Sequence, residues 1–142
     1  MKRSLLTEAA GVPVALAVDG ANRHDMRLAR ETIEGVVVDR PEPTKRRPQG
    51  MCLDKGYDYL EVWEMLEEFN FTAHVAVNDP DAVPVERKAG RKARRWVVER
   101  THSWMNRFRG VLIRWNKKPE NYLAMLHLVC ATIAYRCAGL FG

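Results

Sequence analysis

The sequence has little of what a disulfide-stabilised or zinc-binding protein requires. Its 142 residues include three cysteines, and no two of them form a Cys-x-x-Cys pair. An odd and scattered set of cysteines argues against a disulfide framework or a zinc knuckle, and is typical of a protein in a reducing compartment. We therefore expect a cytoplasmic protein without structural disulfides.

Long apolar runs are missing too. Only Leu5 and Leu6 stand between the basic start of the chain and Thr7, so no signal peptide is predicted. The apolar stretch at residues 122–135 contains His127 and is shorter than the ~20 residues of a membrane span. The sequence therefore predicts no membrane association.

Acidic residues are almost absent from one segment. Residues 91–118 contain ten Lys and Arg and one acid, Glu99, whereas the whole chain carries a net charge of only +5. The rest of the chain is therefore net acidic. A run of cations is usually a solvated face, but a basic segment this concentrated indicates a surface that binds a polyanion.

Apolar residues make up 46% of the chain, enough for one core. The pattern of residues 4–17 predicts two short strands joined by a tight hairpin at Gly11. Met26, Ala29 and Ile33 then recur at the spacing of an amphipathic helix.

A strand, a helix and a strand are predicted next. "MCLD" indicates a brief buried strand, the following helix carries Leu60, Trp63 and Leu66 on one face, and "TAHVAV" indicates another strand. Two further helices are predicted over residues 94–108 and 119–138.

Two charged segments that contain proline, residues 39–50 and 78–91, are predicted surface loops. The element order is β-β-α-β-α-β-α-α. The expected fold class is therefore α/β, a mixed sheet flanked by helices, with residues 1–142 in one domain.

Asp54 directly follows the predicted strand, and ligands of such sheets gather at the carboxyl ends of strands. On the helix of residues 94–108, Glu99 falls on the face opposite Val97. A carboxylate at a strand end and another on a later helix suit a two-metal phosphoryl-transfer site. Each acid also has a simpler interpretation, Asp54 as a turn cap and Glu99 as the i, i+4 partner of Arg95.

Aromatic residues are interleaved with the basic segment. We interpret Trp104, Phe108 and Trp115 as core and loop anchors rather than as base-stacking platforms. His24 and His102 are interpreted as polar surface or capping residues, because no His/Cys spacing indicates a metal site.

Three stretches together carry a resemblance. "LTEAAGVPVALAVDGANRHD", "LDKGYD" and "RRWVVERTHSWMNRFRGVLIRWNKKPENYLAMLHLVCATIAYR" occur in this order. They resemble the carboxyl-terminal portion of bacterial insertion-sequence DDE transposases, a group with a ribonuclease-H-like catalytic domain. The resemblance runs from about residue 2 to the end of the chain, and it implies that residues 1–142 form part of one ribonuclease-H-like catalytic domain.

The resemblance implies that Asp54 is the second acid of the DDE triad and Glu99 the third. Both would be catalytic residues and ligands of two Mg²⁺ ions, with Mn²⁺ as the alternative metal. Arg95 matches the arginine of the family signature around the glutamate. The resemblance also implies a DNA-binding surface, made by Arg94, Arg95, Arg100, Arg107, Arg109, Arg114, Lys117 and Lys118.

The chain departs from the family pattern at two signature positions. Lys92 stands where some members have tyrosine, and Asn106 stands where some have lysine. Asp19 and Asp25 are not assigned as substitutes for the first catalytic acid, although Asp25 is placed to cap a helix or to charge its first turn.

In the family, the first acid lies on the first strand of the sheet, upstream of the segment that resembles residues 2–19. That strand is central, so we expect its absence to leave a gap or exposed edges in the sheet and marginal stability. The missing segment would be supplied by an upstream reading frame.

The sequence thus predicts DNA transposition by Mg²⁺-dependent strand cleavage and transfer, with this chain needing an upstream segment. The expected partners are transposon-end and target DNA, with a homo-oligomer assembling on the DNA at the nucleoid. An inactive remnant that at most binds DNA is the alternative, and a nuclease unrelated to transposition is a third.

Overall fold

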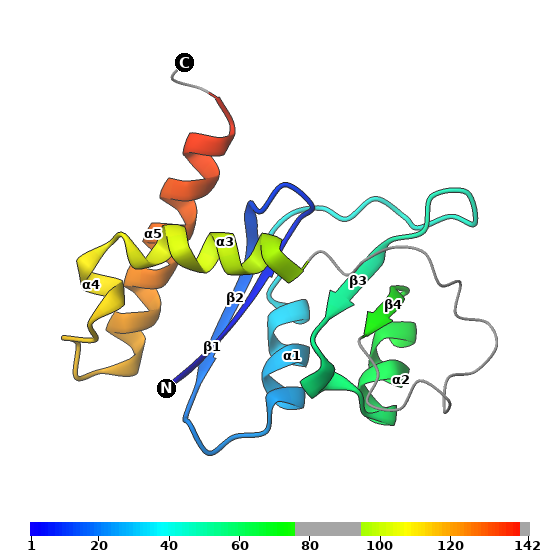
Figure 1. Ribbon diagram of the computed structural model, residues 1–142, viewed down its shortest axis with the longest axis horizontal. Coiled ribbons are helices and arrows are strands. Elements are labelled where there is room, and N and C mark those ends of the chain that lie inside the picture. Colours follow the sequence, from blue (N-terminus) through cyan, green and yellow to red (C-terminus); the bar gives the residue numbers. More distant parts are fainter. Residues whose placement is uncertain (76–94, 140–142) are drawn as a thin grey trace. The chain divides into compact units, whose positions relative to one another are not determined.

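The computed structural model describes residues 1–75 and 95–139 (Figure 1). The chain falls into two compact units, unit 1 (Met1–Asp39 and Trp96–Gly142) and unit 2 (Arg40–Arg95). Unit 1 contains β1 (Lys2–Thr7), β2 (Pro13–Asp19), α1 (Asp25–Glu34), α3 (Arg95–Asn106), α4 (Arg109–Leu112) and α5 (Pro119–Cys137). The first residue of α3, Arg95, is counted with unit 2. Unit 2 contains β3 (Gly50–Leu53), the 3-10 turn η1 (Lys55–Tyr57), α2 (Leu60–Glu68) and β4 (Thr72–Val75).

A β-hairpin organises unit 1, as the sequence predicts. β1 runs antiparallel to β2, and the register shifts after Leu6, so that Thr7 pairs with Pro13. Pro13 has no amide N–H to donate to a regular ladder. It is tolerated here because the pairing is irregular at this strand start. Gly11 turns the chain with φ of 90°, a conformation that favours glycine.

The core of unit 1 lies between the hairpin and the carboxyl-terminal helices. It is formed by one strand residue and six helical residues, Leu16, Met105, Val111, Tyr122, Leu126, Val129 and Ile133. Trp104 and Phe108 pack against this cluster while half-buried. Their packing confirms their interpretation as anchors, and Met105 is a central residue that the helical wheel did not single out.

The predicted helix over residues 94–108 is shorter in the structure. α3 ends at Asn106, and Phe108 is the N-cap residue of the short helix α4. Phe108 has extended backbone angles and packs against the core cluster, which places a bend between the two helices.

Helix α1 packs on the hairpin and buries Leu28, Ala29 and Ile33; Ala29 and Ile33 belong to the predicted apolar face, whereas its third member, Met26, is only half-buried. The Thr32 hydroxyl lies 2.6 Å from the Leu28 carbonyl oxygen and 2.7 Å from the Ser4 hydroxyl. The second of these contacts joins the helix to β1.

Unit 2 is the predicted strand–helix–strand unit. β3 and β4 are parallel, with Met51 opposite Ala73 and Leu53 opposite Val75. A parallel pair requires a crossover, and α2 supplies it. The helix buries Val62, Met65 and Leu66.

The predicted apolar face of α2 is wrong at one position. Leu60 is 70% exposed, although the spacing placed it beside Trp63 and Leu66. Leu60 is the first residue of the helix, and the buried face begins two residues later, at Val62. Trp63 is half-buried and its indole N–H donates to Asp58 Oδ1 at 3.2 Å.

The described strands form two separate two-stranded sheets, β1–β2 and β3–β4. The fold is therefore mixed α/β, but the single mixed sheet expected from the sequence is not formed by the described strands. Each pair is made by a local connection, a tight turn in one case and the α2 crossover in the other.

The segment at residues 39–50 contains no strand or helix before Gly50, apart from an isolated bridge between Thr44 and Arg47. Arg40 fixes this segment, because its guanidinium donates to Gln49 Oε1 and to the Phe69 carbonyl. The predicted loop at residues 78–91 lies outside the described residues.

Candidate functional site

Asp54 lies at the carboxyl end of β3. Its carboxylate Oδ1 accepts a hydrogen bond of 2.6 Å from the Lys55 amide, which makes it the N-cap of η1. The Asp54 carbonyl also accepts from the Tyr57 amide at 3.0 Å. The residue is exposed, so the turn-cap interpretation and a carboxylate presented at a strand end describe the same geometry.

Glu99 is exposed on α3, on the side away from the buried residues Val97, Thr101 and Met105. The helix is fixed to the hairpin turn, because the Thr101 hydroxyl lies 2.7 Å from the Gly11 carbonyl oxygen and 3.1 Å from that of Val97. The helix therefore presents Glu99 to solvent from a rigid support.

The structure describes the two acids separately, since Asp54 belongs to unit 2 and Glu99 to unit 1. Within residues 1–75 and 95–139, no three His, Cys, Asp or Glu side chains are grouped so as to hold a metal ion. Each exposed carboxylate nevertheless has the hard oxygen donors that Mg²⁺ prefers.

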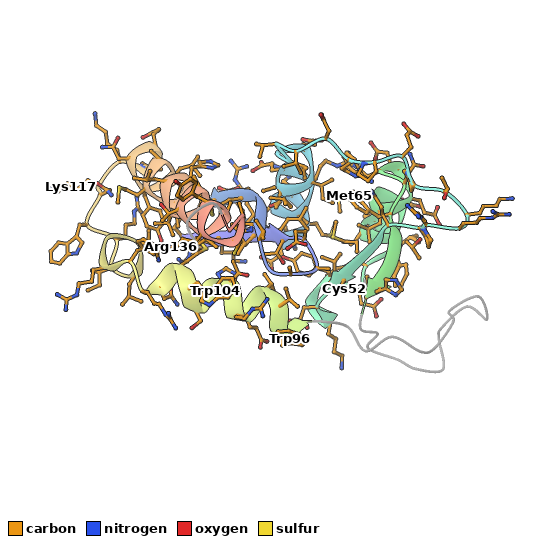
Figure 2. All side chains as sticks on the ribbon, turned by 90° about the horizontal axis from the view of Figure 1, so that it is seen from above. Cys52, Met65, Trp96, Trp104, Lys117 and Arg136 are labelled. Atoms are coloured by element: carbon orange, nitrogen blue, oxygen red, sulfur yellow. The ribbon has the colours of Figure 1, made fainter. Side chains whose placement is uncertain are left out.

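Arg100 is half-buried, and its guanidinium has partners within unit 1. Its guanidinium lies between the rings of Trp96 and Trp104, at 4.9 and 4.8 Å from their centroids, and it donates to the Ala10 carbonyl. Figure 2 shows both tryptophans along α3. The sequence signal was present, because aromatic residues four positions before and after an arginine lie on its side of a helix.

The remaining predicted DNA contacts divide by their surroundings. Arg107, Arg109, Lys117 and Lys118 are exposed. Figure 2 shows the Lys117 side chain at the edge of the molecule, in the loop between α4 and α5. Arg94 and the side chain of Arg95 lie outside the described part of the chain.

Arg114 is exposed but has an internal role. Its Nε and Nη2 atoms donate to the carbonyls of Asn116 and Lys117 at 3.1 and 3.2 Å. Its guanidinium also lies 5.7 Å from the centre of the Tyr122 ring. Arg114 therefore shapes the loop between α4 and α5, a role that its charge alone did not indicate.

Two polar residues of α3, His102 and Asn106, follow Glu99 by three and seven positions and therefore lie on the same side of the helix. Burial lowers the pKa of His102 from its ordinary value of 6.5, and the positive charge of Arg3 lowers it further. Asn106 is one turn along the helix. Its Oδ1 atom and Arg3 Nη1 are buried and have no hydrogen-bond partner in the part of the chain that the structure describes.

The other acids considered from the sequence have structural partners. Asp19 pairs with Arg23 at 3.2 Å and accepts from the Gly20 amide. Asp25 pairs with Lys2 at 2.9 Å. His24, not Asp25, occupies the N-cap position of α1, and its side chain makes no capping hydrogen bond.

Comparison with known proteins identifies the class. Residues 1–134 match the family described as the transposase DDE domain. The chain belongs to this family and is related to insertion-sequence DDE transposases.

A relative is a protein assigned as a transposase for insertion sequence element IS402 of Burkholderia cepacia. It is 30% identical over 137 residues, which cover 94% of this chain. The chain spans 62% of the length of that relative. No solved structure gives a significant match. None of the described helices is long and apolar enough to cross a membrane.

Proposed function

We propose that this chain is part of a transposase catalytic domain in which Asp54 and Glu99 are two of the three metal-binding acids. The observation that carries the proposal is the position of Asp54, exposed directly after the first strand of a parallel β-α-β unit. In α/β proteins the reacting ligands collect at this end of the strands. Membership of the DDE family supplies the chemical class.

Two Mg²⁺ ions would activate the attacking oxygen and stabilise the leaving oxygen during in-line displacement at a DNA phosphate. Asp54 and Glu99 would hold these ions through carboxylate oxygens. The cap bond from Lys55 uses Oδ1 of Asp54 and fixes the direction of its carboxylate. Glu99 would be oriented by the helix that Thr101 fixes to the hairpin.

The third acid would come from a segment outside residues 1–142. Two two-stranded sheets support this part of the proposal, because each leaves backbone groups at strand edges that a further strand could pair. A strand paired at such an edge would also bury apolar surface of its own. We propose an upstream-encoded segment as its source, and assembly as a homo-oligomer on DNA at the nucleoid.

DNA would bind along the basic segment. From Arg100 to Pro119 there are six Lys and Arg and no acid. We assign phosphate contacts to the exposed members, Arg107, Arg109, Lys117 and Lys118. Because phosphate binding releases counterions, the affinity should fall steeply with salt.

The test uses the chain fused to an upstream segment that carries the first acid. This protein should nick DNA in the presence of Mg²⁺ and join the freed 3′-hydroxyl to target DNA. Asp54→Asn and Glu99→Gln should each abolish both steps, whereas the control Glu61→Gln, at an exposed acid of α2, should not. Unchanged cleavage in the two site variants would refute the assignment.

A second candidate is an inactive remnant that at most binds DNA. Only two of the three acids of the triad, Asp54 and Glu99, are assigned in this chain, and two carboxylates alone would hold the metal ions weakly. Salt-sensitive DNA binding without nicking in the fused protein would support the remnant.

A further inference from the structure

The loop between α4 and α5 exposes a large aromatic side chain. Trp115 is 77% exposed, so the sequence interpretation of Trp115 as a loop anchor is wrong. Trp104 and Phe108 pack against the core, as expected of anchors. Leu112 and Ile113, just before it in the chain, are 56% and 53% exposed, so Trp115 belongs to a short stretch of exposed apolar side chains, and grouped exposure of this kind is typical of a binding surface.

The loop holds Trp115 outward because other residues anchor it. Arg114 donates to the carbonyls on the far side of Trp115, at Asn116 and Lys117. Its guanidinium lies over the ring of buried Tyr122, whose hydroxyl donates to the Val111 carbonyl at 3.3 Å. The loop is thus tied on both sides of Trp115, and little ordering is left to occur on binding.

The charge around this side chain identifies the kind of partner. Arg114, Lys117 and Lys118 are exposed in the same loop, and the nearest acids along the chain are Glu99 and Glu120. A flat aromatic ring among cations is the arrangement by which proteins bind unpaired nucleotides: the ring stacks on a base and the cations contact the flanking phosphates. Within an intact duplex the base faces are covered by their neighbours, so only an unstacked base can accept such a ring.

We propose that Trp115 stacks on an unpaired base of the bound DNA while Lys117 and Lys118 contact the flanking phosphates. The proposal rests on the proposed function, in which the basic segment faces DNA. It adds that this loop distinguishes opened or single-stranded DNA from duplex DNA. It also assigns the selectivity to one residue.

The test measures binding of the 142-residue chain to three labelled DNA probes of one sequence: single-stranded, blunt duplex, and duplex with one unpaired base. Trp115→Ala should weaken binding to the first and third probes by about fivefold or more, since stacking on each base contributes strongly. Binding to the blunt duplex should change less than about twofold. Trp115→Phe should keep most of the affinity, because the ring remains.

A matched control is Tyr59→Ala, which removes another exposed aromatic ring, this one from unit 2 beside the acids Asp58 and Glu61. This variant should leave all three affinities unchanged. A spectroscopic readout adds a direct test: 2-aminopurine at the unpaired position should be quenched by the wild-type chain and not by Trp115→Ala.

The outcomes separate this inference from the proposed function. If Lys117→Gln and Lys118→Gln weaken binding while Trp115→Ala does not, DNA binding stands and the stacking contact is refuted. If the chain binds none of the probes at low salt, the DNA-facing surface of the proposed function fails. If Trp115→Ala weakens binding only to phosphatidylserine vesicles, the partner is a membrane and the inference is overturned.

Discussion

The two units of this chain support their acids by different means. Unit 1 has a core drawn from β2, α3, α4 and α5, and its acid, Glu99, lies on the outer side of a helix whose inner side is buried. In its described residues, unit 2 has a small core, two four-residue strands, the 3-10 turn η1 and one α-helix, and its acid, Asp54, caps that turn. The position of Glu99 therefore depends on packing, and that of Asp54 depends on a strand end and a cap bond.

The largest expected effect compares the two cores. Leu126→Ala and Leu66→Ala each empty a site with no solvent exposure, and each should destabilise its own unit by about 2–5 kcal/mol. Hydrogen exchange measured by mass spectrometry should show faster exchange in α5 and β2 for the first variant, and in α2 and β4 for the second. Equal acceleration in both units by either variant would mean that they unfold as one.

The hairpin turn of unit 1 provides the next test. Gly11→Ala should cost about 1–3 kcal/mol, because φ of 90° disfavours alanine and the new Cβ would lie 2.8 Å from Arg100 Nη2. Gly20→Ala is the matched control, since its Cβ would meet nothing within 4 Å. Chemical denaturation should separate the two variants. Equal stability would show that the Arg100 and Thr101 contacts do not fix α3 to the turn.

The cap bond of unit 2 should have a smaller effect on stability. Asp54→Ala removes the acceptor for the Lys55 amide and should cost about 0.5–2 kcal/mol, whereas Asp54→Asn keeps an acceptor and should cost less. Both variants should abolish metal-dependent cleavage in the fused protein. A variant that is inactive but as stable as the wild type separates the chemical role of Asp54 from its structural role.

The smallest expected effect is a pH dependence confined to unit 1. The pKa of His102 is lowered in the folded chain, so between that value and 6.5 the unfolded chain binds more protons. Unit 1 should therefore lose stability as the pH falls below about 6.5. His102→Gln should reduce this loss when thermal unfolding is followed across pH. Because burial is the larger cause, Arg3→Gln should reduce it less.

Local patterns were sufficient to predict much of the fold. The alternation before and after Gly11 predicted the hairpin, and the helical spacing of Ala29 and Ile33 predicted the buried face of α1. Strand pairing over longer distances was not predictable in this way. The four described strands lie close to their predicted positions but form two sheets. The alternation of apolar residues marks a strand and its buried face, and it does not say which other strand is its partner.

Side-chain partners were the other limit of the sequence. The DNA contact expected of Arg100 stays a prediction that rests on its charge, and the sequence does not name the two tryptophans and the hairpin turn that its guanidinium also contacts. Trp115 was counted as an anchor because of its size, but Arg114 and Tyr122 hold the loop in its place. The charge or hydrophobicity of a side chain indicates what kind of contact it can make. Which residue it contacts depends on how the neighbouring helices and turns pack.

The central claim is that an acid from each unit binds the same metal site. Fe²⁺ that replaces Mg²⁺ generates hydroxyl radicals and cuts the chain beside the ion, so the cut positions map its ligands. In the fused protein bound to DNA, we predict cuts near both Asp54 and Glu99, and the loss of both sets in either Asp54→Asn or Glu99→Gln. Cuts near one acid alone, or cuts that persist in both variants, would contradict the account.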